Sequence, residues 1–511
     1  MALQKQPPLE RGAGVLLPVF SLPSPYGIGT IGREARSFVD FLVRAGQRYW
    51  QVLPLGPTSF GDSPYQSFST FAGNPYFIDL EQLIEEGLLL REEAEELPWA
   101  GRADRVDYQA LFQHRFQALR KAYNRSHLKN NGEYRRFCRE NKDWLDDYAL
   151  YMALKERHGF REWLLWEEPL RLRDDAALKE QREACAGQIG FWKFCQFLFF
   201  QQWRELKRYA NQRGISIIGD IPIYVALDSA DVWAHPELFQ LNEERRPHAV
   251  AGVPPDAFSS TGQRWGNPLY DWERMETDGF SWWKDRIAAA ASLYDLLRID
   301  HFIGICRYYA IPAKNETAEG GQWIPGPGKK LTDAIRQAAG DCRIIAEDLG
   351  VVVPAVRRLL TQAGFPGMKV LSFAFDGDAS NEHLPHHYVS NLVVYGGTHD
   401  NQTLRGLFSE KSKKELKFAR RYLHVKKKNN LPAAVMRAAY ESVAAVAVMQ
   451  MQDLLELGGD ARMNLPSTIG NNWQWRLIPG QLSHSLAKRM RRQAETYGRL
   501  APAEGKEPEQ P

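Results

Sequence analysis

Short apolar segments, most of them separated by helical segments, recur along this chain of 511 residues. Most of these apolar segments are continuous rather than alternating, which is typical of strands buried on both faces of a parallel sheet. Eight segments have this character, at residues 14–20, 49–55, 215–224, 296–300, 343–348, 368–376, 391–395 and 462–465. Strands that alternate with helices form parallel sheets, and eight of them close a (β/α)8 barrel. We therefore predict an α/β fold, a TIM barrel of eight strands.

Helical periodicity and uneven strand spacing predict how the barrel is elaborated. Apolar residues recur at helical spacing in residues 34–45, 191–213, 282–294, 332–339 and 353–363. About 160 residues separate the second and third strands and about 70 the third and fourth, far more than an ordinary loop. We predict a barrel over 12–476 with large inserted subdomains after strands 2 and 3, at about 58–190 and 226–290. A C-terminal helix at 477–500 and a flexible tail at 501–511 would follow.

Composition and charge exclude several classes of protein. Hydrophobic residues make up 44% and charged residues 25%, so disorder is excluded as the main character of the chain. A net charge of +3 argues against nucleic acid as the main partner. The longest apolar runs, 194–200 and 443–449, are far shorter than the ~18 residues of a membrane helix, so no membrane association is expected. Five cysteines without a CxxC pair, and an N-terminus without an apolar signal core, predict a cytoplasmic protein without a disulfide framework.

Carboxylates stand at or just after the ends of several predicted strands, at Asp220, Asp300, Glu347, Asp348, Asp376 and Asp400. A charged residue at the end of a buried strand is costly unless it is paired or functional. Because the carboxyl ends of barrel strands meet at one mouth, these acids should converge there. Converging carboxylates suit glycoside chemistry, in which one attacks or stabilises the anomeric carbon and another protonates the leaving oxygen. Any single acid could equally cap a helix or pair with an arginine, and spacing alone does not say which acids react.

Two neighbours of these acids sharpen the prediction. Arg298 lies two positions before Asp300 and on the same strand face, where a guanidinium keeps a carboxylate ionised and oriented. His399 precedes Asp400, and such a pair can hold adjacent sugar hydroxyls. Taken alone, His399 is as readily interpreted as a loop histidine.

Aromatic residues make up 12% of the chain and gather in two loop segments, 61–74 and 253–272. Aromatic faces stack on the apolar CH patches of sugar rings. Candidates for sugar platforms or for a lid are Tyr65, Phe258, Trp265 and Tyr270. The alternative is that each of these rings packs back on the body of the protein.

Three further patterns receive the less specific interpretation. Residues 27–32 fit GxGxxG, but prolines separate them from the preceding strand and no acid ends the next strand, so a turn is favoured over a nucleotide site. The histidines at 383, 386 and 387 lack a cysteine or HExxH partner, so a solvated loop is favoured over a metal site. The basic stretch 411–428 is interpreted as an exposed helix face.

Eight ordered sequence blocks resemble those of one enzyme family. They read LPSPYGIGTIG, SPYQSFSTFAGNPYFIDL, GDIPIYVALDSADVWA, VAGVPPDAFSSTGQRWGNPLYDW, LLRIDHF, IIAEDLG, GGTHDN and RMNLPSTIGNNWQWR. Together they resemble the amylomaltases, the 4-α-glucanotransferases (disproportionating enzymes) of glycoside hydrolase family 77, which are relatives of the α-amylases. The resemblance spans residues 12–476 and implies a barrel with inserted subdomains, no cofactor and no required metal.

The resemblance also implies roles for individual residues. It matches Asp300 to the catalytic nucleophile, Glu347 to the general acid/base and Asp400 to the acid that stabilises the transition state. Arg298 and His399 match residues that flank the bound glucose. The remaining matches are expected to lie close to the site, to contact the glucan or to cover the cleft, at Asp220, Ser63, Tyr65, Asp256, Gln263, Trp265 and Asn464.

The activity that the resemblance implies is transfer of α-1,4-glucan segments from a donor glucan to the 4-hydroxyl of an acceptor glucan or glucose. The implied mechanism is retaining and passes through a covalent glucosyl-enzyme. The expected partners are maltooligosaccharides, amylose, glycogen or starch, and the expected state is a monomer or weak homodimer. The alternative is an α-amylase-type retaining hydrolase with the same acids and with water as acceptor. A non-catalytic glucan-binding protein is disfavoured, because it has no need of three buried acids.

Two positions depart from the family pattern. Ile303 stands where the family often has arginine, and Gln402 stands where it often has aspartate. Both changes remove a charge, one of each sign. Our hypothesis is that the two positions face each other near the mouth, as an uncharged pair that replaces an ion pair. The alternative is independent drift at each position.

Overall fold

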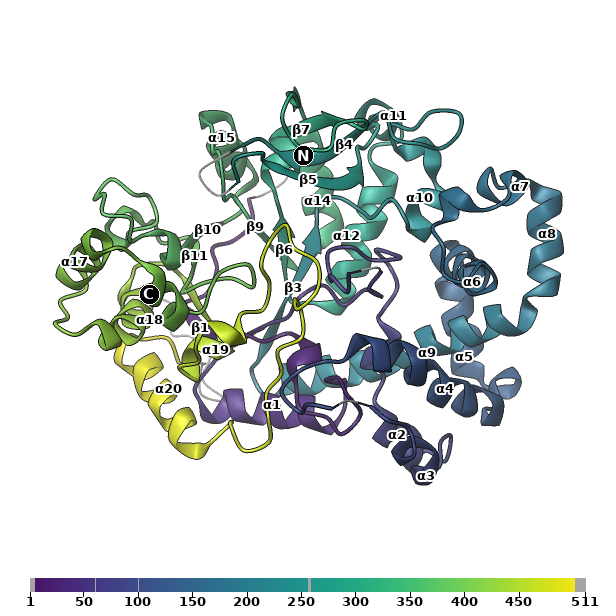
Figure 1. Cartoon of the computed structure of the whole chain (residues 1–511), viewed down its shortest axis with the longest axis horizontal. Coiled ribbons are helices and arrows are strands. Elements are labelled where there is room, and N and C mark those ends of the chain that lie inside the picture. Colours follow the sequence, from purple (N-terminus) through teal and green to yellow (C-terminus); the bar gives the residue numbers. More distant parts are fainter. Residues whose placement is uncertain (1–4, 60, 100, 256–258, 501–511) are drawn as a thin grey trace.

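The computed structural model describes residues 5–59, 61–99, 101–255 and 259–500. Its centre is a sheet of eight parallel strands in the order β10-β11-β12-β1-β2-β3-β6-β9 (Figure 1). The strands are β1 (Gly12–Leu16), β2 (Tyr49–Gln51), β3 (Ser216–Pro222), β6 (Leu296–Asp300), β9 (Arg343–Ala346), β10 (Gly367–Val370), β11 (Leu392–Tyr395) and β12 (Val446–Gln450). The Ala346 N–H donates to the carbonyl of Pro366, just before β10, at 2.9 Å, so the two ends of the sheet meet. The predicted α/β barrel is confirmed.

Two of the strand predictions were wrong in part or in whole. Residues 462–465 form no strand. The eighth strand is β12, which covers the second half of the apolar run 443–449 and ends one residue beyond it. A helix at Met451–Leu454 follows β12 directly, and the Ala and Met residues of the strand also favour helices, so periodicity alone does not separate them. β10 ends at Val370 and a 3-10 helix follows at Leu371–Phe373, so Asp376 does not end a strand and is exposed.

Helices surround the barrel strands. Those that run between or after the strands are α1 (Arg33–Arg44), α9 (Ala186–Gln212), α12 (Ser281–Leu293), α14 (Lys329–Ala339), α15 (Pro354–Ala363), α16 (Leu404–Glu410), α17 (Lys413–Tyr422), α18 (Leu431–Glu441) and α19 (Met451–Leu454). In α1 the buried residues include Ala35, Phe38, Val39 and Leu42, a spacing that gives one apolar face toward the strands. The final helix, α20 (His484–Thr496), packs against α1 and α18 (Figure 1).

The long segment between β2 and β3 is helical. It contains α2 (Leu80–Glu85), α3 (Arg91–Glu95), α4 (Tyr108–Arg125), α5 (Gly132–Glu140), α6 (Lys142–Arg157), α7 (Glu168–Arg171) and α8 (Asp175–Ala184), and it returns to the barrel through α9. The side chains of Asp79, Asp107 and Asp174 accept N–H groups at the starts of α2, α4 and α8, which explains where these helices begin. The domain boundaries given above stay predictions.

A second, four-stranded antiparallel sheet lies over the carboxyl ends of β6 and β9, in the order β5-β4-β7-β8 (Figure 1). β4 (Ala249–Val253) and β5 (Gln263–Pro268) come from the segment after β3, together with α10 (Ala230–Ala234) and α11 (Trp272–Thr277). β7 (Arg307–Pro312) and β8 (Gln322–Pro325) follow α13 (Ile303–Cys306), after β6. None of these four strands was predicted from the sequence, and β5 lies in the stretch 253–272 that was expected to be a loop.

The glycine turn at 27–32 packs tightly, as predicted. A Cβ added at Gly29 would lie 2.0 Å from the carbonyl oxygen of Val19, and one added at Gly32 would lie 2.1 Å from the Asp79 side chain. These glycines therefore permit close approach of backbone and side chains. The basic stretch lies along α17 and the turn after it, where most of its cations are exposed, so this prediction is also confirmed. Among the described residues, no helix combines the length and hydropathy needed to cross a bilayer.

Candidate active site

The carboxyl ends of β3 and β6 bring two acids and one arginine together. The parallel register pairs Asp220 with Arg298, and Asp300 lies two residues beyond Arg298 on the same face. Arg298 Nη1 donates to both carboxylate oxygens of Asp220, at 2.8 and 2.7 Å, and Nη2 lies 2.7 Å from Asp300 Oδ1. Asp220 is fully buried, whereas 29% of the Asp300 side chain is exposed. One guanidinium therefore holds a buried acid and directs a second one toward the mouth.

The charge of Arg298 is central to this cluster. Burial lowers the pKa of Arg298, but Asp220 and Asp300 outweigh it and raise that pKa well above its ordinary value. Burial raises the pKa of Asp220 more than Arg298 lowers it, and Asp300 raises it further. Arg298 therefore stays charged, and it is the group that allows two carboxylates to lie this close.

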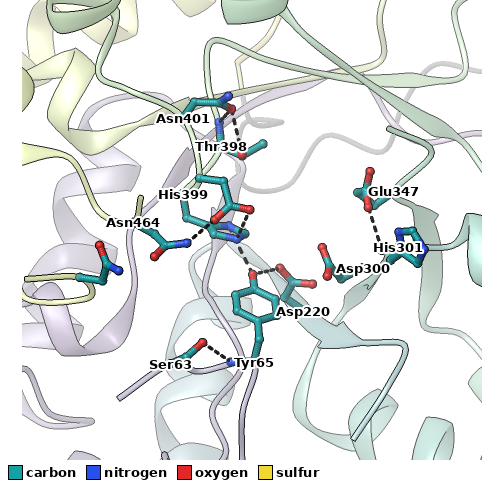
Figure 2. A network of polar contacts seen from close by, with 12 residues as sticks. Ser63, Tyr65, Asp220, Asp300, His301, Glu347, Thr398, His399, Asn401 and Asn464 are labelled. Atoms are coloured by element: carbon teal, nitrogen blue, oxygen red, sulfur yellow. Dashed lines mark hydrogen bonds and ion pairs between the residues drawn. The ribbon is translucent and has the colours of Figure 1, made fainter. Parts of the chain in front are cut away.

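Glu347 follows β9 and is buried. Its Oε2 accepts the backbone N–H of His301 at 2.7 Å, and its Oε1 accepts the N–H of Leu349 at 2.6 Å (Figure 2). His301 has a φ of 52°, in the left-handed region, in the turn just beyond Asp300 where its N–H points at Glu347. Burial and then the charge of Asp300 raise the pKa of Glu347 to about 8, although Arg298 and the two N–H groups oppose this. Glu347 therefore holds a proton at neutral pH.

His399 and Asp400 lie in the loop after β11 and form an ion pair, with His399 Nε2 3.4 Å from Asp400 Oδ2. Asn464 Nδ2 donates to Asp400 Oδ1 at 2.6 Å (Figure 2). Burial raises the pKa of Asp400, but the charge and contact of His399 and the bond from Asn464 outweigh it and lower the pKa to about 2. Burial lowers the pKa of His399, and Asp400 raises it above its ordinary value. The structure thus favours the charged forms of both groups.

Tyr65 connects the two halves of the cluster. Its hydroxyl donates to Asp220 Oδ2 at 2.8 Å and lies 3.3 Å from His399 Nδ1 (Figure 2). Its ring stacks on the His399 ring, with centroids 4.9 Å apart and planes at 23°. Ser63 Oγ accepts the Tyr65 N–H at 3.3 Å and so shapes the turn that presents the ring. The burial of Tyr65 raises its pKa well above its ordinary value, so it remains a donor.

Strand β5 contributes an aromatic side chain at the edge of this cluster. Trp265, on β5, meets the His301 ring edge to face, with centroids 4.8 Å apart, and its indole N–H donates to Gln263 Oε1 at 3.1 Å. Trp265 therefore lies next to the turn between Asp300 and Glu347. Tyr270 is buried and packs on Tyr224 and Phe239, so the body-packing alternative holds for this ring. Asp256 and Phe258 lie outside the described residues.

Several neighbours of the site were not singled out from the sequence. His301 supplies the N–H to Glu347, and Asn401 Oδ1 accepts from Thr398 N and Oγ1, which fixes the turn that carries His399. Arg462 Nη2 donates to the Asp400 carbonyl at 2.7 Å, and Trp473 packs 5.7 Å from the His399 ring. All five residues lie in the blocks LLRIDHF, GGTHDN and RMNLPSTIGNNWQWR quoted above, but no single residue pattern in these blocks indicates the contacts.

The structure records other partners for Ile303 and Gln402, and the hypothesis that they form a pair stays a prediction. Ile303 is buried at the start of α13, which packs against β7 and α15. Gln402 instead donates from Nε2 to Glu410 at 3.1 Å, on α16, and lies against Gly406 and Gly459. The two positions follow β6 and β11, which are not neighbours in the sheet.

The histidines at 383–387 do not form a cluster of metal ligands. His386 and His387 are exposed, as predicted for a solvated loop, whereas His383 is partly buried and accepts the Val370 N–H at 3.1 Å. Within residues 5–59, 61–99, 101–255 and 259–500, no group of three or more His, Cys, Asp or Glu side chains could hold a metal ion.

A barrel whose mouth holds buried carboxylates, one with a raised and one with a lowered pKa, has the arrangement of a glycoside-processing enzyme. The family model described as 4-alpha-glucanotransferase matches residues 17–481, and the chain belongs to that family, glycoside hydrolase family 77. The predicted enzyme class and the resemblance are therefore confirmed.

Relatives with the same description cover nearly the whole chain. A 4-alpha-glucanotransferase of Thermus thermophilus is 50% identical over 503 residues, which cover 96% of this chain and 100% of that protein. One of Clostridium butyricum is 47% identical over 483 residues, which cover 94% and 99%. The solved structure of the amylomaltase from Streptococcus agalactiae in complex with acarbose has a TM-score of 0.93 and 41% identity, and it covers 96% of this chain and 100% of that one.

Proposed function

We propose that the enzyme transfers α-1,4-glucan segments between glucans by a retaining mechanism, with Asp300 as nucleophile, Glu347 as general acid and base, and Asp400 as the third acid. One observation carries the proposal: Arg298 holds the partly exposed Asp300, while the buried Glu347 keeps a proton at neutral pH. An acid held by an arginine, beside a buried acid whose pKa is raised, is the arrangement that a nucleophile and a general acid require.

The first step breaks the donor glucan. The Asp300 carboxylate attacks the anomeric carbon, and Glu347 gives its proton to the glycosidic oxygen as the bond from that oxygen to the anomeric carbon breaks. The segment that leaves carries the freed 4-hydroxyl as its new non-reducing end and keeps the donor's original reducing end, and the rest of the donor stays bound to Asp300 as an ester. This geometry predicts carboxyl groups of Asp300 and Glu347 about 5–5.5 Å apart.

The second step forms the new glucan. The oxygen of an acceptor 4-hydroxyl attacks the anomeric carbon, Glu347 takes the hydroxyl proton, and the ester bond to Asp300 breaks. The two inversions at carbon give net retention. Water in place of the acceptor would give hydrolysis by the same bond changes.

The remaining residues are proposed to bind the sugar at the reacting carbon. The ionised Asp400 and charged His399 would hold the 2- and 3-hydroxyls, with contacts that strengthen as the ring flattens. Asp220 and Tyr65 are supported as members of this set by their bonds to Arg298 and toward His399. Asn464 orients Asp400, Ser63 shapes the Tyr65 turn, and Gln263 and Trp265 are proposed to cover the bound glucan.

The substrate class follows from the family. We propose maltooligosaccharides and longer α-1,4-glucans as donors and acceptors, and we expect acarbose to compete with them, because the Streptococcus agalactiae relative is described in complex with it. The proposed steps use only carboxyl groups, so we keep the prediction that no cofactor is needed. A cytoplasmic location and a monomer or weak homodimer also stay predictions.

Incubation with maltotriose tests the proposal. Transfer converts maltotriose into glucose and longer maltooligosaccharides while the number of reducing ends stays constant, whereas hydrolysis creates one reducing end for each bond broken. Products are resolved by chain length, and reducing ends are counted in the same samples. Shorter products alone, with a matching rise in reducing ends, would instead support the hydrolase.

A further inference from the structure

A buried arginine outside the proposed catalytic cluster contacts three of the segments that carry it. Arg286 lies on α12 and is 1% exposed. Its Nε donates to Thr70 Oγ1 at 2.8 Å, its Nη1 to the carbonyl of Ile223 at 3.0 Å and to the Tyr270 hydroxyl at 3.2 Å, and its Nη2 to the carbonyl of Pro222.

Each contact lies a few residues beyond a site residue. Thr70 follows Tyr65 in the loop after β2, Pro222 and Ile223 follow Asp220 at the end of β3, and Tyr270 follows Trp265 just beyond β5. The Tyr270 hydroxyl also donates to the Ile223 carbonyl at 2.9 Å, so two of the three segments are joined directly as well. One guanidinium therefore fixes the distances between these three segments.

Within the part of the chain that the structure describes, Arg286 forms no direct ion pair, although its charge favours the ionised form of the buried Asp231 nearby. Among the described residues its hydrogen-bond partners are carbonyl and hydroxyl oxygens, and its guanidinium faces the Trp283 ring at 4.8 Å. Asp231 contacts the same loop residue as Arg286, since its Oδ2 accepts the Thr70 N–H at 2.9 Å. Burying a charge without a direct ion pair is costly. The rigid fork of five donors, which lysine lacks, is the property that this position uses.

A cavity of about 110 Å³ adjoins this arginine. Its wall includes Tyr65 and Asp220 of the site, Arg286 and Thr70 of the clamp, and Trp144 and Phe200 farther out. This space can hold several water molecules, and it shares Tyr65 and Asp220 with the proposed sugar site. The contacts of Arg286 are thus placed where loosening would let water reach the reacting carbon.

A second set of contacts joins the same three segments. Gln66 Nε2 donates to Asn267 Oδ1 at 3.2 Å, and Asn267 Nδ2 donates to the Val225 carbonyl at 2.7 Å. Because these bonds do not involve α12, loss of Arg286 should loosen the segments without separating them. A graded change in function is therefore expected rather than loss of the fold.

We propose that Arg286 is a positioning residue that favours transfer over hydrolysis, because it keeps Tyr65, Asp220 and Trp265 in register around the covalent intermediate. The inference rests on the proposed function. When the segments loosen, the oxygen of water forms the bond to the anomeric carbon, the Asp300 carboxylate leaves, and Glu347 takes one proton from the water.

The test compares Arg286→Lys and Arg286→Met with the unmodified enzyme on maltotriose. Transfer is measured from the longer products and hydrolysis from the gain in reducing ends. We expect the ratio of hydrolysis to transfer to rise about ten-fold in both variants, because small misplacements of binding groups change rates on that scale. Lysine should not rescue the ratio, because a single ammonium cannot reach all four acceptors.

Arg499→Met is the matched control. Arg499 is equally buried, and its hydrogen-bond partners among residues 5–59, 61–99, 101–255 and 259–500 are backbone carbonyls, including those of Ala444, Ala445 and Tyr440, at the other end of the barrel. We expect this variant to lose stability without a change in the ratio. The variants Thr70→Val and Tyr270→Phe each remove one acceptor of Arg286 and leave its charge in place. They should raise the ratio by smaller amounts, and they test the inference even where Arg286→Met does not fold.

The outcomes are distinct. An unchanged ratio of hydrolysis to transfer in folded Arg286 variants would overturn the inference, as would an equal rise in Arg499→Met. If the Arg286 variants do not fold, an unchanged ratio in Thr70→Val and Tyr270→Phe would overturn it instead. Failure of the proposed function looks different, because the unmodified enzyme would then give no products longer than maltotriose.

Discussion

The raised pKa of Glu347 makes the stability of the folded protein depend on pH in a way that one substitution can isolate. In the unfolded chain this carboxyl has its ordinary pKa of 4.5, and in the folded protein burial and Asp300 raise it to about 8. The folded state therefore binds the proton more tightly than the unfolded chain. Stability from this proton is fully present below pH 4.5 and is lost as the pH rises toward 8.

The size of the effect follows from the two pKa values. Between about pH 5 and pH 9 the proton on Glu347 should contribute a change of about 4 kcal/mol in the free energy of unfolding. A chain of this length has an unfolding entropy of about 1 kcal/mol per degree, so the change corresponds to about 4 °C in Tm. Glu347→Gln removes the titrating group. In this variant the backbone N–H groups of His301 and Leu349 face an amide in place of the carboxylate. This changes the free energy of unfolding by an amount that does not vary with pH.

Tm is measured for both proteins in parallel from pH 5 to pH 9. We expect the Tm of Glu347→Gln, relative to the unmodified enzyme, to rise by about 4 °C across this range, since other titrating groups largely cancel. The kcat/KM of the unmodified enzyme should fall with a midpoint near the same pH of about 8, because the general acid is lost there. If the Tm difference is the same at both ends of the range, the argument for a raised pKa fails.

Three further predictions follow from the site. Asp300→Asn should lower kcat by several orders of magnitude in a folded protein, and should lower the pKa of Glu347 as read from its carboxyl infrared band, because a negative neighbour is removed. Tyr65→Phe should raise the KM for maltotriose more than it lowers kcat, since the lost hydroxyl joins Asp220 to His399; steady-state kinetics would contradict this if KM were unchanged. EDTA should leave the transfer rate unchanged, and loss of activity that one added cation restores would reveal a missed metal site.

The two strands that the sequence predicted best are closed by an acid at their carboxyl ends. β6 matches its predicted range and ends at Asp300, and β9 falls within its range and is followed by Glu347. β12 was missed because α19 follows it without a break and its Ala and Met residues also favour helices, so local periodicity does not separate the two. β8 is mostly exposed or half-buried and pairs only with β7, so its sequence has no continuous apolar run to recognise.

The site was predictable where a charged residue had no other reason to be present. Asp300 and Glu347 end buried strands, and the two-residue spacing placed Arg298 on the face of Asp300. What the sequence left undetermined are contacts set by the relative placement of strands. The register of β3 against β6 gives Arg298 its second partner, Asp220, and the start of α16 after β11 gives Gln402 its partner Glu410. Such contacts depend on the whole barrel rather than on any local pattern.

In the proposed mechanism, the charge of Asp300 helps to keep Glu347 protonated as an acid, and the loss of that charge helps to convert Glu347 into a base. The charge of Asp300 is among the causes that raise the pKa of Glu347, while Arg298 opposes it. When Asp300 becomes an ester it loses its charge, but Arg298 remains charged between it and Asp220. The pKa of Glu347 must then fall, because one opposing negative charge is gone and the positive one is not. Glu347 is therefore protonated when a leaving group needs a proton and tends to ionise when the acceptor hydroxyl must lose one. A reduced charge on the arginine position would keep Glu347 protonated in the second half of this cycle, which is why Arg298 belongs with the proposed acids as a functional group.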